Sequence, residues 1–263
     1  MKTSECYLPE GSYTALPEVR QALSSPDGLR RAQDEGMILE AVAQRCTAAH
    51  DLLFDFGFAQ GVMPRSCCAL GVAEGDTREI AILSRVGKPT CFAVTEVDET
   101  ADPPAVWLSR TIVQQRAQDF FLDTLTPGDV IPAAVTHLEP FGAFVDIGCG
   151  VASLIGIENL SVSRIFHPSD RLSVGQSIYA AVRSVDPVAR RISLTHRELL
   201  GTWEQNAALF SPGETVRGVV RSVNRMVYLS SSRPTCPGWP SRAATSPRGP
   251  WYPCTSNPSC PSA

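Results

Sequence analysis

Two phenylalanines lie three positions apart in the segment Phe141-Gly142-Ala143-Phe144-Val145-Asp146. Aromatic rings on an exposed sheet surface can stack on unpaired nucleobases, and each stack contributes about 1–3 kcal/mol. In a regular strand the two rings would point to opposite faces, but Gly142 can bend the chain and bring both to one face. Burial of both rings in a hydrophobic core is the alternative, and the aromatic pair alone does not decide between the two.

Arginines are concentrated after this segment. Six of them lie between residues 164 and 197, against two acidic residues, and they are Arg164, Arg171, Arg183, Arg190, Arg191 and Arg197. A guanidinium group can bind phosphate with its forked donors and can also stack on a base. Because the whole chain has a formal net charge of −4, nucleic acid would have to be held by this local patch. A solvated basic surface without a ligand is the alternative.

Two short features accompany the arginines. Asp186 precedes Arg190 and Arg191 in a predicted turn, where it could orient one of the arginines or simply form the turn. The loop Arg164-Ile165-Phe166-His167-Pro168 combines a cation, an aromatic ring and an imidazole. This loop could be a second RNA contact or a packed surface loop.

No motif in the sequence is typical of catalysis or of a metal site. The four histidines lie outside any Ser or Cys nucleophile motif, and there is no glycine-rich phosphate loop. The nine cysteines include no C-x-x-C pair. We therefore expect a protein that is not an enzyme, that binds no cofactor or metal, and whose thiols are reduced.

The chain shows no pattern of membrane insertion. Its 263 residues contain no apolar run of membrane-spanning length, and the first residues do not resemble a signal peptide. We expect a cytoplasmic location and no membrane partner.

Two series of short strands position these residues. Strands are predicted at 37–45, 52–58, 79–83, 90–97 and 106–109, and again at 130–138, 143–147, 153–157, 177–186 and 191–195. Helices are predicted at 28–35, 111–125 and 197–210. Pro127-Gly128-Asp129 and Pro212-Gly213-Glu214 each precede a valine-rich strand, so the chain contains an internal repeat of about 85 residues whose third copy has begun.

Residues 126–198 closely resemble the S1 RNA-binding domain, a five-stranded oligonucleotide-binding barrel. The resemblance depends on a Gly-acid-Val start, a Phe-Gly-x-Phe-Val-Asp core, a His-Pro loop, a Val-Gly-Gln turn and a Val-Asp…Arg-Ile-Ser-Leu end, all of which are present. It implies an RNA-binding face made of Phe141, Phe144, Asp186 and Arg191. The neighbouring basic segments add three candidates for RNA contact, namely Arg190, Arg164 and His167.

One expected contact is absent. The family often has a histidine after the third strand, where this chain has Gly156. This departure implies weaker or differently aimed binding.

Residues 35–110 resemble a degenerate copy of the same domain. Val86-Gly87-Lys88 and Leu108-Ser109-Arg110 match its late turn and its end, whereas the Phe-Gly-x-Phe motif is absent. Phe54, Phe56 and Phe58 alternate and are expected on the core face of a strand. The tandem is similar to bacterial ribosomal protein S1, whose first domains tend to contact the ribosome, and this implies protein contacts here.

The predicted fold class is mainly β with connecting helices: tandem five-stranded OB-fold barrels of the S1 type and a disordered C-terminal tail. The expected domains are an arm with a short helix at 1–34, a degenerate S1-like barrel at 35–110, a linker helix at 111–125, an intact S1 barrel at 126–198, the helix and first strand of a truncated third barrel at 199–223, and a tail at 224–263.

The expected function is binding of single-stranded RNA, such as mRNA, in translation. The second barrel would hold the RNA, and the first would contact protein, with the small ribosomal subunit as the expected partner. Two alternatives stay open: an accessory RNA-binding regulator in RNA decay or transcription, and a protein-interaction scaffold.

The tail has an unusual composition. From Leu229 to Ala263 there is no acidic residue, and eight prolines and eight serines occur. The third barrel copy stops after its first strand, and a one-base shift near Asn224 permits codons for further barrel-like strands. We hypothesise that residues 224–263 are out of frame; a genuine Pro/Ser-rich tail is the alternative.

Overall fold

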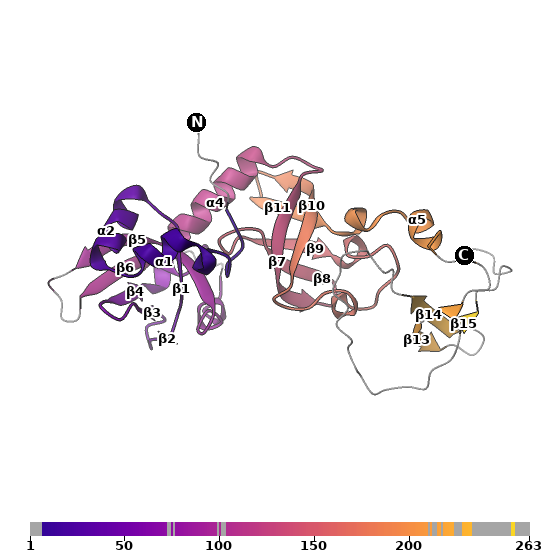
Figure 1. The fold of residues 1–263 in the computed structure, drawn as a ribbon, viewed down its shortest axis with the longest axis horizontal. Helices are drawn as coiled ribbons and strands as arrows, with labels where there is room; N and C mark the ends of the chain where they lie inside the picture. Colours follow the sequence, from indigo (N-terminus) through magenta and orange to yellow (C-terminus); the bar gives the residue numbers. More distant parts are fainter. Residues whose placement is uncertain are drawn as a thin grey trace.

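The computed structural model describes residues 7–72, 75, 77–98, 100, 104–209, 211, 215–216, 218–223, 228–232 and 254–255. Two β domains lie side by side, and the long helix α4 (Arg110–Thr124) runs between them (Figure 1). The predicted class, mainly β with connecting helices, is confirmed. Within the described ranges, no helix has the length and apolar character needed to cross a lipid bilayer.

The second domain is a closed barrel of five strands. They are β7 (Val130–Glu139), β8 (Gly142–Asp146), β9 (Ala152–Gly156), β10 (Ser177–Asp186) and β11 (Arg191–Thr195). β7 pairs with β8 and β10, β8 pairs with β9, and β11 closes the barrel between β9 and β10. Ile131, Ala133 and Val135 are buried, as the two-residue period of a strand with one core face requires.

The first domain has the same topology with its first strand interrupted. Its strands are β1 (Leu39–Val42), β2 (Arg45–Cys46), β3 (Leu52–Asp55), β4 (Gln60–Met63), β5 (Pro89–Asp98) and β6 (Ala105–Ser109). They form one sheet in the order β1-β5-β6-β4-β3-β2. β1 pairs with β5 and β2 with β3, just as the two halves of β7 pair with β10 and β8. The interruption at Ala43 and Gln44 therefore makes this domain, predicted as a degenerate copy of the barrel, a curled half-barrel.

One strand of the first domain was predicted at the wrong place. Residues 79–83 form no strand, because α3 (Ile80–Leu83) occupies this position, and the missing strand is the short β4. Ile82 is buried and Ile80 is exposed, so the apolar residues fit a single helical turn that rests on the core.

The alternating phenylalanines border the core as predicted, but to different extents. Phe54 is fully buried with its ring centroid 5.3 Å from that of Phe92, and the ring of Phe56 lies 6.3 Å from the same ring. Phe58 lies beyond the end of β3 and is only half-buried.

The N-terminal arm packs on the outside of the first domain. It contains η1 (Tyr13–Ala15), α1 (Pro17–Ala22) and α2 (Pro26–Glu35). The N-cap of α2 is Ser25, whose hydroxyl accepts from Gly28 N at 3.1 Å. α2 ends at Gly36, whose φ of 62° is the left-handed conformation that glycine adopts freely. The arm covers the outer face of β1 and β5, where the Glu40 carboxylate accepts from Thr14 N at 2.8 Å.

The remaining short helices lie in connections, and four short strands follow the second domain. The helices are η2 (Arg65–Cys67), η3 (Ile157–Asn159), η4 (Pro168–Asp170), η5 (Arg197–Leu200) and α5 (Trp203–Ala207). The strands are β12 (Thr215–Val216), β13 (Gly218–Val223), β14 (Tyr228–Ser232) and β15 (Cys254–Thr255), paired as β12–β15 and β13–β14. Of residues 224–263 only β14 and β15 are described, so the expectations of disorder and of a frame shift concern residues that otherwise lie outside the described ranges.

Candidate nucleic-acid interface

The two phenylalanines of the Phe-Gly-x-Phe segment lie together on the outside of the second barrel. Their ring centroids are 5.9 Å apart and their planes are perpendicular. Phe141, in the turn before β8, is 55% exposed, and Phe144, on the outer face of β8, is half-buried. The alternative that both rings fill the core is therefore excluded, and at least one ring face is open to a ligand.

Gly142 is the reason that the pair can form. A side chain at this position would collide with the carbonyl oxygen of Ile155 on the neighbouring strand β9. Glycine lets β8 and β9 approach closely at the Gly142–Gly156 pair, and the chain then presents Phe141 and Phe144 on either side of it.

A row of outward-facing side chains crosses the barrel at Phe144. Strand register places Phe144 beside His137 of β7 and Leu154 of β9, and Leu154 beside Ser193 of β11. His137 was not among the predicted site residues; its Nε2 lies 2.9 Å from the Glu139 carboxylate. This row is a shallow surface of mixed aromatic, aliphatic and polar groups.

Two predicted residues, Asp186 and Arg191, lie on the far side of this row from Phe141. Arg191 begins β11, is exposed, and is the strand partner of Asp186. The Asp186 carboxylate accepts from the backbone N–H groups of Val188 and Ala189, at 3.0 and 2.9 Å. Asp186 was expected either to orient an arginine or to form the turn, and these two hydrogen bonds belong to the turn.

Arg190 points away from the rest of the predicted set. It has a φ of 50°, its Nε donates to Gln118 Oε1 at 3.0 Å, and its Nη2 pairs with the Asp119 carboxylate. Gln118 and Asp119 belong to α4, so Arg190 fixes the β10–β11 hairpin against the linker helix. The same contact lowers the pKa of Asp119, because hydrogen bonds from Arg190 and Gln115 favour the ionised carboxylate.

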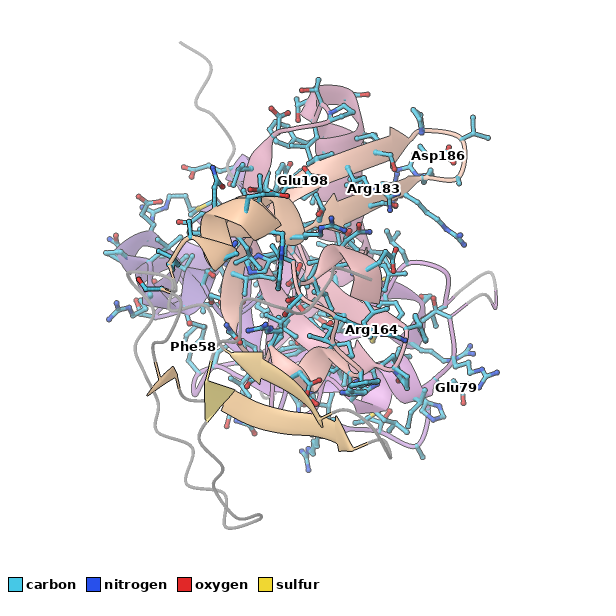
Figure 2. All side chains as sticks on the ribbon, turned by 90° about the vertical axis from the view of Figure 1, so that its right-hand side faces the viewer. Phe58, Glu79, Arg164, Arg183, Asp186 and Glu198 are labelled. Atoms are coloured by element: carbon cyan, nitrogen blue, oxygen red, sulfur yellow. The ribbon has the colours of Figure 1, made fainter. Side chains whose placement is uncertain are left out.

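The predicted loop residues form a separate, local group. The guanidinium carbon of Arg164 lies 5.8 Å from the centroid of the Phe166 ring, within the range of a cation–π contact. His167 caps η4, where its Nδ1 accepts from Ser169 N at 3.1 Å. Figure 2 shows Arg164 on a different part of the surface from Arg183 and Asp186.

The corresponding row of the first domain carries different side chains. By register, Arg45 takes the place of His137, Leu53 that of Phe144, and Trp107 that of Ser193. Trp107 is 39% exposed, and sequence reasoning did not single it out. Its position in the alternating strand Ala105–Ser109 was the available signal.

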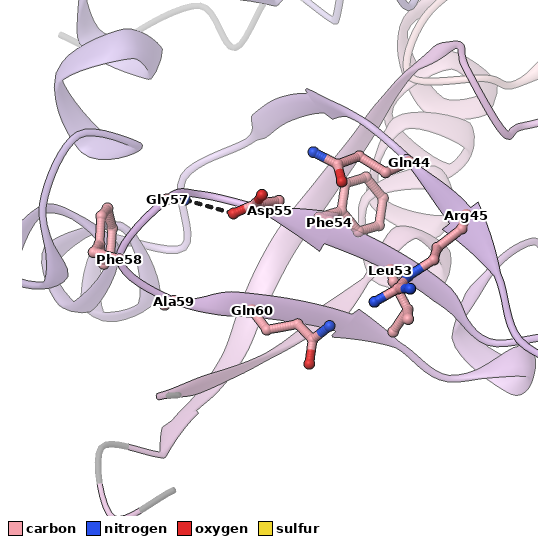
Figure 3. Close-up of a pocket in the computed structure, with 9 residues that line it drawn as sticks. All are labelled: Gln44, Arg45, Leu53, Phe54, Asp55, Gly57, Phe58, Ala59 and Gln60. Atoms are coloured by element: carbon pink, nitrogen blue, oxygen red, sulfur yellow. Dashed lines mark hydrogen bonds between the residues drawn. The ribbon is translucent and has the colours of Figure 1, made fainter. Parts of the chain in front are cut away.

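A hollow of about 270 Å³ lies at one end of this row. It is lined by Gln44, Arg45, Leu53, Phe54, Asp55, Gly57, Phe58, Ala59 and Gln60 (Figure 3). Most of its lining comes from β3 and the turn that joins β3 to β4, and Gln44 and Arg45 complete it.

A buried ionic cluster joins the arm to both domains. The Glu10 carboxylate accepts from Arg110 Nε at 2.7 Å and from Arg85 Nη1 at 2.5 Å, and the Glu10 backbone N–H donates to Asp146 Oδ2 at 2.7 Å. Burial, together with the nearby Glu10 carboxylate, raises the pKa of Asp146 to about 6. The last residue of the Phe-Gly-x-Phe-Val-Asp segment thus holds the second barrel against the arm.

Thiols lie at the same junction. Five cysteines of the two domains are free, and two of them, Cys91 of β5 and Cys149 of the β8–β9 turn, meet across the domains beside Tyr13. Burial raises the pKa of Cys91 well above its usual value, and the Cys149 thiol adds to the rise, so the thiol stays protonated.

Comparison with known proteins identifies the domain that carries the exposed aromatic pair. Residues 124–197 match the family described as S1 RNA binding domain. The second barrel is an S1 domain. This S1 domain includes Phe141, Phe144 and all five strands of the closed barrel.

Curated relatives extend the similarity beyond the S1 domain. Small ribosomal subunit protein bS1 of Staphylococcus haemolyticus is 40% identical over 220 residues, which cover 81% of this chain and 53% of that protein. The bS1 protein of Staphylococcus aureus is 36% identical over 215 residues, 80% of this chain and 52% of that protein. A bS1 homolog of Bacillus subtilis is 36% identical over 157 residues, 58% of this chain and 40% of that protein. The chain thus spans about half the length of these relatives.

Proposed function

We propose that this chain binds single-stranded RNA, including mRNA, in translation, and that it does so without catalysis. The observation that carries this proposal is the exposed aromatic pair of the S1 domain, Phe141 and Phe144, on the outside of the barrel. The similarity to bS1 proteins supports a place at the small ribosomal subunit. RNA contact by Arg164 and His167, from their separate loop, is part of the proposal, and Asp186 would keep Arg191 in place by forming the turn.

The two domains would divide the work. The first domain has Leu53 at the Phe144 position, and Glu96 lies on its corresponding row where the second barrel has Ser184. This additional negative charge disfavours phosphate and is compatible with a protein partner. We therefore assign RNA to the second barrel and protein contact to the first domain.

A titration of the full chain with fluorescently labelled oligo-uridine at low salt tests the proposal. The wild-type protein should bind, and the double variant Phe141→Ala/Phe144→Ala should bind at least tenfold more weakly, because each lost stack removes about 1–3 kcal/mol. The circular dichroism spectrum should not change, since both rings lie outside the core. Equal affinity of both proteins, or no binding by the wild type, would overturn the proposal.

A further inference from the structure

The outer face of the S1 domain has a bare position next to its aromatic pair. Gly142 and Gly156 are strand partners, and neither has a side chain to project from the sheet. Gly156 lies two residues after Leu154 on β9, so both positions face outward, about 7 Å apart along the strand. A side chain at position 156 would therefore lie beside the two phenylalanines.

The carboxylate of Glu158 fills this position. Its Oε1 lies 2.5 Å from the place that a Cβ atom of residue 156 would occupy, and Oε2 lies 2.9 Å from it. Glycine at 156 therefore leaves room for the Glu158 carboxylate in the position that it occupies. The side chain of Glu158 is 65% exposed, so the carboxylate can reach a ligand on this face.

The neighbours of this carboxylate leave it available. Asn159 Nδ2 donates to Oε1 at 3.2 Å, and Arg183 Nη1 lies 3.9 Å from the same oxygen. Arg183 extends from the β10 bulge and is itself exposed, so this is a loose surface ion pair (Figure 2). Arg183 offsets the negative charge and can contact a phosphate while Oε2 faces a base.

We propose that Glu158 makes the S1 domain select bases that present N–H donors, with guanine and cytosine preferred over uracil. This inference rests on the proposed RNA binding. An ionised carboxylate only accepts hydrogen bonds, and cytosine offers its N4 amino group while guanine offers N1–H and its N2 amino group. Uracil offers a single N–H between two carbonyl oxygens, and these oxygens repel a carboxylate. A base stacked on Phe141 or Phe144 brings its edge toward Glu158.

The test compares three oligonucleotides of equal length: all-uridine, and uridine with one central guanosine or one central cytidine. The full-length wild-type protein should bind the guanosine and cytidine versions at least about fivefold more tightly than all-uridine. A well-aligned side-chain contact to a base edge contributes about 1–3 kcal/mol. In Glu158→Gln this preference should fall to within about twofold of unity, because the amide has both a donor and an acceptor.

Glu198→Gln is the matched control, because it removes an equal charge from an exposed position in η5. It should keep the wild-type preference even if the overall affinity rises. The same preference in Glu158→Gln as in wild type, or tighter binding of all-uridine by wild type, would overturn the role of Glu158. Failure of the wild type to bind any of the three RNAs would instead overturn the proposed function.

Discussion

The two domains share one strand topology but present different side chains at equivalent outward positions. The second domain has Phe144 on the outer face of β8 and Arg191 at the start of β11. Register places Leu53 and Ala105 at these two positions in the first domain. Core positions are constrained by packing, whereas outward positions are free to change. The barrel therefore fixes where a site can be, and the exposed residues decide which ligand it takes.

A second difference concerns the face formed by the first and fourth barrel strands. In the first domain this face is covered by the arm, and Glu40 and Cys91 on it are buried. The equivalent residues of the second domain, Pro132 and Tyr179, are exposed, and Tyr179 is 65% exposed. The arm thus covers this face of the first domain, whereas the equivalent face of the second domain is open at Pro132 and Tyr179.

The largest change in the free energy of unfolding should come from removing the Glu10 ion pairs that hold the arm. Glu10→Ala leaves the buried Arg110 and the half-buried Arg85 without their shared carboxylate, and breaking such a buried pair costs about 3–5 kcal/mol. The free energy of unfolding from urea denaturation measures this loss. Glu18→Ala, on the exposed side of α1, should change it by less than about 0.5 kcal/mol. Equal values for both variants would mean that the arm does not hold the domains.

The next largest effect is on the pH dependence of the free energy of unfolding, and it distinguishes two aspartates in equivalent turns. Asp146 Oδ1 accepts from Gly148 N and is buried, whereas Asp55 Oδ1 accepts from Gly57 N and is exposed. The pKa of Asp146 is raised in the folded chain from 3.8 to about 6, so the folded state binds more protons. The contribution of Asp146 therefore favours folding at low pH and is lost as the pH rises from 3.8 to about 6, a change of at most about 3 kcal/mol.

Urea denaturation at pH 4.5 and at pH 7 measures this contribution, because the two pH values lie on either side of the raised pKa of Asp146. Asp146→Asn should remove the corresponding part of the wild-type pH dependence, and Asp55→Asn should retain it. An unchanged pH dependence in Asp146→Asn would assign the effect to other groups.

A smaller effect compares the aromatic position with its counterpart. Phe144→Ala should weaken binding of oligo-uridine by about 5- to 150-fold, through the loss of one base stack worth about 1–3 kcal/mol. Leu53→Ala alters the equivalent position of the first domain and should leave the affinity within about twofold. Fluorescence anisotropy at one salt concentration measures both. Similar losses in the two variants would show that RNA contacts both domains.

The smallest effect distinguishes two adjacent arginines. Arg191 is exposed beside the aromatic row, so Arg191→Ala should reduce the salt dependence of RNA binding by about 0.7 in the slope of log K against log salt. Arg190 is held by Asp119 of α4, so Arg190→Ala should leave the slope unchanged. A loss of slope in Arg190→Ala alone would reverse these assignments.

Local patterns predicted much of this structure, and non-local contacts explain the rest. The five strands of the S1 domain lie where alternation and turn residues predicted them, because each has one core face. The strand prediction for residues 79–83 was wrong, because a short apolar run of five residues fits a strand and a helical turn equally well. Arg190 was grouped with Arg191 since no sequence pattern reveals its contact with α4.

The candidate site follows from the sequence in part. The contiguous motif indicated Phe141 and Phe144, and the departure from the family pattern drew attention to Gly156. No sequence pattern indicated that the Glu158 carboxylate lies in the space beside Gly156. The Glu10 cluster could not be predicted, since its members lie far apart in the chain.

That distance has a consequence for the newly synthesised chain. The contact between Glu10 and Asp146 spans 136 residues. At a synthesis rate of about 5–20 residues per second, Asp146 leaves the ribosome roughly 7–27 s after Glu10. For the last part of this interval all strands of the first domain have been synthesised, while Glu10 still lacks Asp146. The contact between the arm and the second barrel therefore forms later than the contacts of the arm within the first domain.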